Sequence, residues 1–116
     1  DALPMVTREA SLSAAVLEIS RKGMGMTAIV DPGNQVAGIF TDGDLRRALD
    51  RDLDLRTLRI EQVMKTGPRS IEPDRLAVEA VRLMEEFHIS QILVVDAQGV
   101  LVGALNTHDL FKAGVL

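Results

Sequence analysis

Cysteine, tryptophan and tyrosine are absent from this chain of 116 residues, and three phenylalanines are its only aromatic side chains. Without cysteine the chain can form no disulfide, thiol nucleophile or cysteine-based zinc site, and this composition fits a reducing compartment, so we expect a cytoplasmic location. The scarcity of aromatic rings removes the platforms on which single-stranded nucleic acid stacks. A net charge of −4 also disfavours binding to a phosphate backbone. We therefore expect no nucleic-acid partner.

Long apolar runs and the usual catalytic patterns are missing as well. No apolar run approaches the roughly 20 residues that a membrane-spanning helix needs, so we expect no membrane partner. His88 and His108 are the only histidines, and they lack the spacing of metal ligands, so no metal site is expected. We find no P-loop, no Ser-His-Asp order and no paired carboxylates, and we expect the chain to carry no catalytic residue and no bound cofactor.

What the sequence does contain is a duplication. Its apolar fraction of 47% and charged fraction of 26% are those of a globular protein. A shift of 65 residues without a gap superposes identical residues in two helices, a turn and a strand. The matched pairs are Ala15 and Ala80, Val16 and Val81, Val30 and Val95, Asp31 and Asp96, Gly38 and Gly103, Asp44 and Asp109, Leu45 and Leu110, and Ala48 and Ala113. Such agreement at one offset indicates an internal repeat.

Each copy is predicted to have the order β-α-β-β-α. In the first copy, a short strand near residue 5 precedes a helix over 11–22, strands over 26–30 and 36–40, and a helix over 45–50. In the second copy the corresponding ranges are 70–71, 76–87, 92–95, 100–105 and 108–113, with Asp74 as the expected N-cap of the long helix. About 50 residues bury too little for an independent core. We therefore expect a mixed α/β (α+β) fold, in which repeats 1–58 and 59–116 pack sheet to sheet as one pseudo-two-fold body.

The junction between strand and helix at residues 38–45 is the first candidate site. It offers the hydroxyl of Thr41, the carboxylate of Asp44 and the free N–H groups of a helix's first turn. Together these groups suit a polyol phosphate, because the N–H groups bind phosphate and the carboxylate accepts from sugar hydroxyls. The alternative is that Thr41 or Asp42 is only a helix N-cap.

These features resemble the tandem CBS domain pair, a regulatory module. The residues that carry the resemblance are Val94-Val95-Asp96 with Ile29-Val30-Asp31, the glycines at 38 and 103, Thr41 with Asp44-Leu45, and Asp109-Leu110. The likeness covers essentially the whole chain. Segments 17–22, 25–27, 38–47 and 108–110 are also similar to the C-terminal half of bacterial D-arabinose 5-phosphate isomerases. Their catalytic domain precedes the CBS pair, and since this chain starts at Asp1 without Met, we expect that domain upstream in a longer protein.

The resemblance implies specific ligand contacts. In CBS pairs that bind nucleotides, the motif's Thr contacts phosphate and the Asp three residues later binds the ribose, which corresponds to Thr41 and Asp44. The second copy has Asn106 in place of the Thr, with Thr107 adjacent and Asp109 retained. The opposite repeat is expected to complete each cleft, with Ile89 and Ser90 near Asp44, and Met24 and Gly25 near Asp109.

Two functions follow as expectations from this resemblance. In the first, the chain senses a nucleotide effector, either a CMP-linked octulosonate sugar or AMP, ADP or ATP, and regulates an isomerase of lipopolysaccharide sugar synthesis. In the second, the module binds no ligand and only assembles subunits. A homodimer through the CBS pair is expected, with a higher homo-oligomer in the full-length protein.

Overall fold

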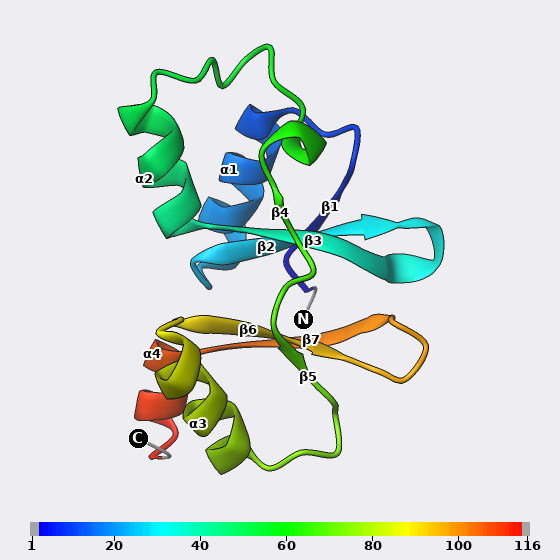
Figure 1. Cartoon of the computed structure of the whole chain (residues 1–116), viewed down its shortest axis with the longest axis vertical. Coiled ribbons are helices and arrows are strands. Elements are labelled where there is room, and N and C mark those ends of the chain that lie inside the picture. Colours follow the sequence, from blue (N-terminus) through cyan, green and yellow to red (C-terminus); the bar gives the residue numbers. More distant parts are fainter. Residues whose placement is uncertain (1–2, 115–116) are drawn as a thin grey trace.

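The computed structural model describes residues 3–114, in which two sheets lie face to face and the helices cover their outer sides (Figure 1). The first sheet has the strand order β1-β2-β3-β4, and the second has the order β5-β6-β7. No described helix is long and apolar enough to cross a membrane. The predicted fold class, a mixed α/β pair of small sheets with two helices each, is confirmed.

The first lobe follows the predicted order. Its elements are β1 (Met5–Thr7), α1 (Leu12–Lys22), β2 (Met26–Asp31), β3 (Gln35–Thr41) and α2 (Asp42–Asp50). β1 runs parallel to β2, and β2 pairs antiparallel with β3. The α1 helix begins after Ser11, whose side chain caps it, and ends at Gly23, whose φ of 66° only glycine adopts freely.

The second lobe repeats this connectivity. Its elements are β5 (Ser70–Ile71), α3 (Ala77–Phe87), β6 (Gln91–Val95), β7 (Leu101–Asn106) and α4 (Thr107–Lys112). The prediction that Asp74 caps the long helix is wrong. The cap position is Leu76, whose N–H donates to the Glu79 side chain at 3.5 Å. Asp74 lies two residues before that position, so its carboxylate makes no cap bond to the first turn.

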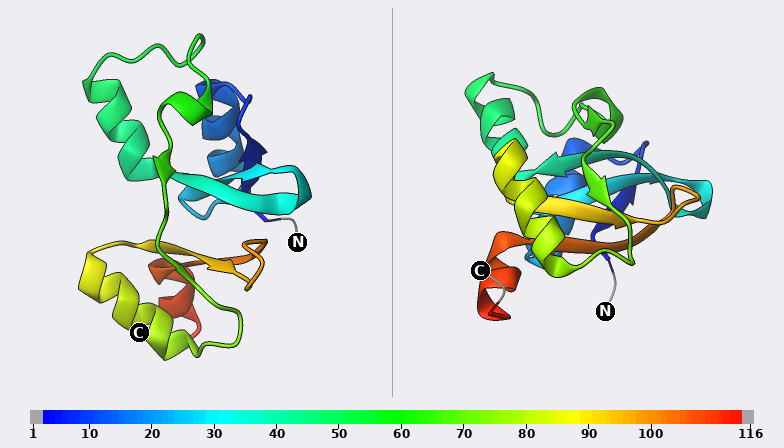
Figure 2. Two further views of the ribbon diagram at one scale, coloured as in Figure 1. Left: turned by 45° about the vertical axis from the view of Figure 1, so that its right-hand side comes forward. Right: turned by 60° about the horizontal axis from the view of Figure 1, so that its bottom comes forward.

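The segment between the two lobes packs on the first one. After a turn of 3₁₀ helix (Ile60–Gln62), β4 (Lys65–Thr66) pairs antiparallel with β3, although it follows the predicted repeat boundary. Ile60 is fully buried in the first lobe's core. The chain then turns at Gly67, where φ is 58°, and crosses to β5 in the other sheet (Figure 2). The crossing segment therefore closes one side of the gap between the lobes.

An apolar layer between the two sheets joins the lobes. Its buried members come from both repeats: Met26, Ala28, Val30, Ile39, Leu93 and Leu101. The two hairpin turns also meet, since the Val36 N–H donates to the Gly99 carbonyl at 3.0 Å and Gln35 forms a bridge with Val100. Residues 35 and 100 are related by the same shift of 65, so this contact lies at the pseudo-two-fold axis. The lobes therefore form one body.

We expect Gly38→Ala to destabilise the lobe contact with β4. A Cβ at residue 38 would lie 2.7 Å from the Lys65 carbonyl oxygen and 2.8 Å from the Met64 sulfur, so β4 must move away. Overpacking of this kind costs about 1–3 kcal/mol of unfolding free energy, measurable by urea denaturation. Gly43→Ala is the matched control, because its Cβ would meet only the flexible end of Arg47 at 3.3 Å. Equal stability of the two variants would contradict the prediction.

Candidate ligand-binding cleft

A cleft of about 780 Å³ opens between the two lobes, at the end of the sheets opposite the hairpin turns. Its walls are the end of β3 with the first turns of α2, the crossing segment from β4 to β5, and the loop after α3. The lining residues are Ile39, Thr41, Asp42, Gly43, Arg46, Arg47, Lys65, Thr66, Gly67, Pro68, Arg69, Phe87, His88, Ile89, Ser90 and Gln91. The volume lies in the range of small-molecule sites, about 300–1,000 Å³. We refer to it as the Thr41 cleft.

Thr41 and Asp44 form a reciprocal cap at the start of α2. The Asp44 N–H donates to Thr41 Oγ1 at 3.2 Å, and the Thr41 N–H donates to Asp44 Oδ2 at 3.0 Å. Two N–H groups at the helix start therefore have partners within the chain. The predicted cap role of Thr41 is confirmed, and the same residue lines the cleft.

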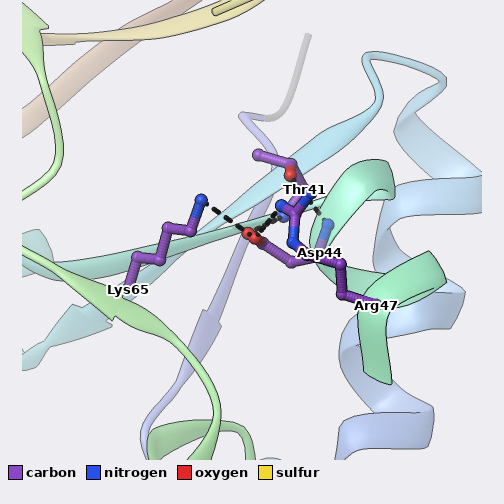
Figure 3. A network of polar contacts seen from close by, with 4 residues as sticks. All are labelled: Thr41, Asp44, Arg47 and Lys65. Carbon is purple, nitrogen blue, oxygen red and sulfur yellow. Dashed lines mark hydrogen bonds and ion pairs between the residues drawn. The ribbon is translucent and has the colours of Figure 1, made fainter. Parts of the chain in front are cut away.

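The second carboxylate oxygen of Asp44 collects two cations that also line the cleft (Figure 3). Arg47 Nη2 lies 2.6 Å from Oδ1, and Lys65 Nζ lies 3.2 Å from the same atom. The Asp44 side chain is only 6% exposed, whereas those of Arg47 and Lys65 are 60% and 63% exposed. A buried carboxylate on α2 thus ties β4 to the helix through side chains whose far surfaces remain in solvent.

Burial by itself would raise the pKa of Asp44, since it penalises the charged form. Hydrogen bonds from Arg47, the Thr41 N–H and Lys65 outweigh this effect, so the pKa of Asp44 lies below its usual value. Asp44 is therefore ionised at neutral pH and holds both cations in place.

The Thr41 cleft is strongly basic for an acidic protein. Arg46, Arg47, Lys65 and Arg69 line it together with a single carboxylate, that of Asp42, in a chain of net charge −4. The guanidinium carbon of Arg69 lies 3.7 Å from the centroid of the Phe87 ring. This cation–π contact holds Arg69 against the ring wall. Neither Arg46 nor Arg69 forms an ion pair within residues 3–114.

Several predicted site residues meet in this cleft. Ile89 and Ser90 line it together with Thr41, so residues from the two repeats do face one another there. Asp44 does not line it. Its carboxylate lies behind Arg47 and Lys65 and borders a neighbouring cavity of about 640 Å³. Its predicted contact with a ribose stays a prediction.

The second strand–helix junction differs from the first. Asn106 is buried, its Oδ1 accepts from the Asp109 N–H at 2.7 Å, and its Nδ2 donates to the Met24 carbonyl at 3.2 Å. Asp109 is exposed, and Thr107 lies with Ile89 and Ser90 beside a smaller pocket. Gly25, expected near Asp109, instead accepts from the Asp42 N–H at 3.0 Å. A Cβ on Gly25 would lie 3.0 Å from Gln91, which lines the Thr41 cleft.

Sequence reasoning missed the cations of the crossing segment. Lys65 and Arg69 reach the Thr41 cleft because β4 pairs with β3 before the chain crosses to the second sheet. The available signal was the breaker at 66–68 between two basic residues. Within residues 3–114 no group of three or more His, Cys, Asp or Glu side chains gathers in a way that could hold a metal ion.

Comparison with known proteins gives a consistent assignment. A family model described as CBS domain matches residues 1–51 and again 60–115. The chain is 49% identical over all 116 residues to arabinose 5-phosphate isomerase KdsD of Pseudomonas aeruginosa, of which it covers 36%. It thus spans about a third of the length of the curated relatives it matches. The resemblance seen in the sequence is confirmed.

Solved structures show the same architecture. A CBS domain protein of Pyrobaculum aerophilum, complexed with AMP, superposes with a TM-score of 0.88 at 20% identity, covering 99% of this chain and 88% of that one. A putative signal-transduction protein with CBS domains from Burkholderia ambifaria gives 0.85 at 29% identity, covering 98% and 83%. At 20% identity the first likeness concerns the fold alone.

We expect Asp44→Asn to lower the unfolding free energy at pH 7 by about 1 kcal/mol or more, because two charged hydrogen bonds weaken. The folded-state pKa of Asp44 is lowered. Its stabilising contribution is therefore complete above the unfolded-state pKa of about 4 and is lost as pH falls through the lower folded-state value. Urea denaturation at pH 7 and pH 3 should show the gap between wild type and variant narrowing in acid. The exposed Asp74→Asn is the control, and a gap of equal size at both pH values would contradict the prediction.

Proposed function

The chain belongs to the CBS domain family, and from this premise we propose that it is the ligand-sensing regulatory module of a D-arabinose 5-phosphate isomerase. The ligand is an anionic nucleotide or nucleotide sugar in the Thr41 cleft. The isomerase assignment is supported by the 49% identity over the full chain, and the catalytic domain lies in the part of the relatives that this chain does not cover.

The observation that carries the ligand class is the charge of the cleft. Four cationic side chains converge on it, in a chain that is acidic overall. Such a local excess attracts and holds an anion where net charge would repel it. The first turn of α2 adds the positive end of a nine-residue helix, which also favours phosphate. A neutral ligand makes no use of these groups.

Arg47 and Lys65 give the site a way to respond to phosphate. Each is mostly exposed, lines the cleft and is held at Asp44 Oδ1 in the ligand-free chain. An incoming phosphate competes for both cations, because their side chains can turn from Asp44 toward the cleft without backbone movement. Asp44 then has an oxygen available for a sugar hydroxyl, as the family resemblance implies.

Arg69 and Phe87 suit the planar part of such a ligand. A guanidinium stacked on a ring presents its other face for stacking, and Arg combines this with a positive charge. Adenine and cytosine bases both have faces that can stack there. We therefore carry forward both ligand classes, the adenine nucleotides AMP, ADP and ATP and the CMP-linked octulosonate sugar.

Regulation follows from where the cleft lies. Its walls belong to both lobes and to the crossing segment, so a bound ligand fixes the geometry of all three. A ligand that prefers one geometry of the whole protein shifts the population toward it, by as much as its affinities for the two states differ. We propose that this shift is transmitted to the attached isomerase domain.

The alternative function, subunit assembly without a ligand, rests on exposed apolar side chains. The large ones are Leu17, Leu49, Leu76, Val78, Val102 and Phe111, and Leu76 and Phe111 are 66% and 67% exposed. Exposed apolar groups of this kind favour association of copies. On this view the module forms a homodimer, and a higher homo-oligomer in the full-length protein, whether or not the cleft binds a nucleotide.

A thermal-shift panel with AMP, ADP, ATP, CMP and the CMP-linked octulosonate is expected to give a clear stabilisation. A ligand at 100 times its Kd adds roughly 2.7 kcal/mol, and each kcal/mol raises the Tm of a domain of this size by about 4 °C or more. A shift with the CMP-linked sugar alone supports feedback control of its own pathway. A shift with adenine nucleotides indicates energy sensing, and a flat panel favours the assembly function.

We expect Arg69→Ala to weaken nucleotide binding while leaving the unfolding free energy nearly unchanged, because Arg69 is exposed and its only close partner is Phe87. Loss of the stack and one charge should cost about 1–3 kcal/mol of binding, measurable by calorimetry. Arg56→Ala is the matched control, since Arg56 is exposed in the linker and lines neither cavity. The same loss in both variants would show that only net charge matters.

The double variant Thr41→Ala plus Asp44→Ala separates the two functions. A sensor loses its ligand-induced Tm shift but stays folded and associated, apart from the cost of the lost cap, about 1 kcal/mol. Circular dichroism and sedimentation check folding and association. If the module only assembles subunits, the variant has no ligand response to lose.

A further inference from the structure

The Asn106 side chain uses both ends of its amide to close the second junction. Its oxygen caps α4 through the Asp109 N–H, and its nitrogen reaches across to the Met24 carbonyl in the loop after α1. The residue is only 7% exposed. One side chain from the second repeat is thus bonded to the backbone of the first, at the place where the pseudo-two-fold axis predicts a cleft.

The first junction has no such bond. Shifting by 65 residues relates Asn106 to Thr41 and Met24 to Ile89. Thr41 and Ile89 both line the open cleft, and the hydrogen bonds within residues 3–114 include none between them. The other cross-lobe contact is kept in both copies, since the Asp42 N–H donates to Gly25 O and the Thr107 N–H donates to Ser90 O, each at 3.0 Å. The two junctions therefore share a frame and differ at Asn106.

The charges around the two junctions differ in the same sense. The counterparts of Arg46, Arg47 and Arg69 under the shift are Phe111, Lys112 and Pro4. Only one of the three is a cation. Asp109 adds an exposed carboxylate, whereas Asp44 is buried and paired. An anionic ligand thus gains little at the second junction even apart from the Asn106 bond.

We propose that the Asn106–Met24 bond takes the place of a ligand at the second junction, so that each chain binds one anionic nucleotide, in the Thr41 cleft. This inference rests on the proposed function. Asn106 acts as a permanent tie between the lobes on one side. The lobes can then respond to a ligand only on the other side, where Thr41, Arg47 and Lys65 lie.

The test is the binding stoichiometry by calorimetry, with AMP and the CMP-linked octulosonate as probes. Wild type is expected to bind one equivalent, and Thr41→Asn, which retains a capping side chain, is expected to lose binding because the amide closes the first cleft. Asn106→Thr combined with Phe111→Arg is expected to bind a second equivalent. Phe111→Arg alone is the matched control and should remain at one, since the tie is intact. Phe111 is 67% exposed, so the arginine is tolerated.

Two equivalents bound by wild type would overturn the inference and leave the proposed function standing. It is also overturned if the Asn106→Thr, Phe111→Arg variant stays at one equivalent while circular dichroism shows it folded. If neither probe binds wild type or the double variant, the proposed function fails and this inference fails with it. Loss of binding in Thr41→Asn also requires that its circular dichroism spectrum matches wild type.

Discussion

The apolar layer between the two sheets is the constraint on which the rest of the molecule depends. Each lobe has helices on only one face of its sheet, so the other face stays wet unless a second sheet covers it. Residues from both lobes, Met26 and Ile39 from one and Leu93 and Leu101 from the other, fill this layer. Pairing the sheets in this way brings the two strand–helix junctions to the end of the molecule opposite the hairpins. The cleft between lobes is thus a by-product of burying two small sheets.

Helix capping and ligand chemistry use the same residues at the Thr41 junction. The cap needs a carboxylate at the third helical position, and that carboxylate is buried because it bonds the backbone of Thr41. A buried charge requires compensation, which Arg47 and Lys65 supply. The cations that satisfy Asp44 are therefore the ones available at the cleft surface. A structural reading of this motif and a functional one do not exclude each other.

The sequence predicted what local pattern and duplication determine. The shift of 65 residues gave the two lobes, Gly23 gave the end of α1, and Thr41 gave the cap of α2. It failed where distant segments decide the outcome. Asp74 is a good cap residue in isolation, but the helix starts at Ala77. Arg69 and Phe87 meet only because the chain crosses between the sheets at Gly67, and no periodicity encodes that crossing.

The inequality of the two junctions has a cause in the architecture itself. A tandem pair has two repeats but only one segment that runs between them, and this segment brings Lys65 and Arg69 to the Thr41 cleft. At the other junction the corresponding place is taken by the chain before β1, where Pro4 is the counterpart of Arg69. Even identical repeats would therefore form unequal clefts. Once one cleft has the cations, an amide that ties the other shut loses no ligand and fixes the two lobes on that side.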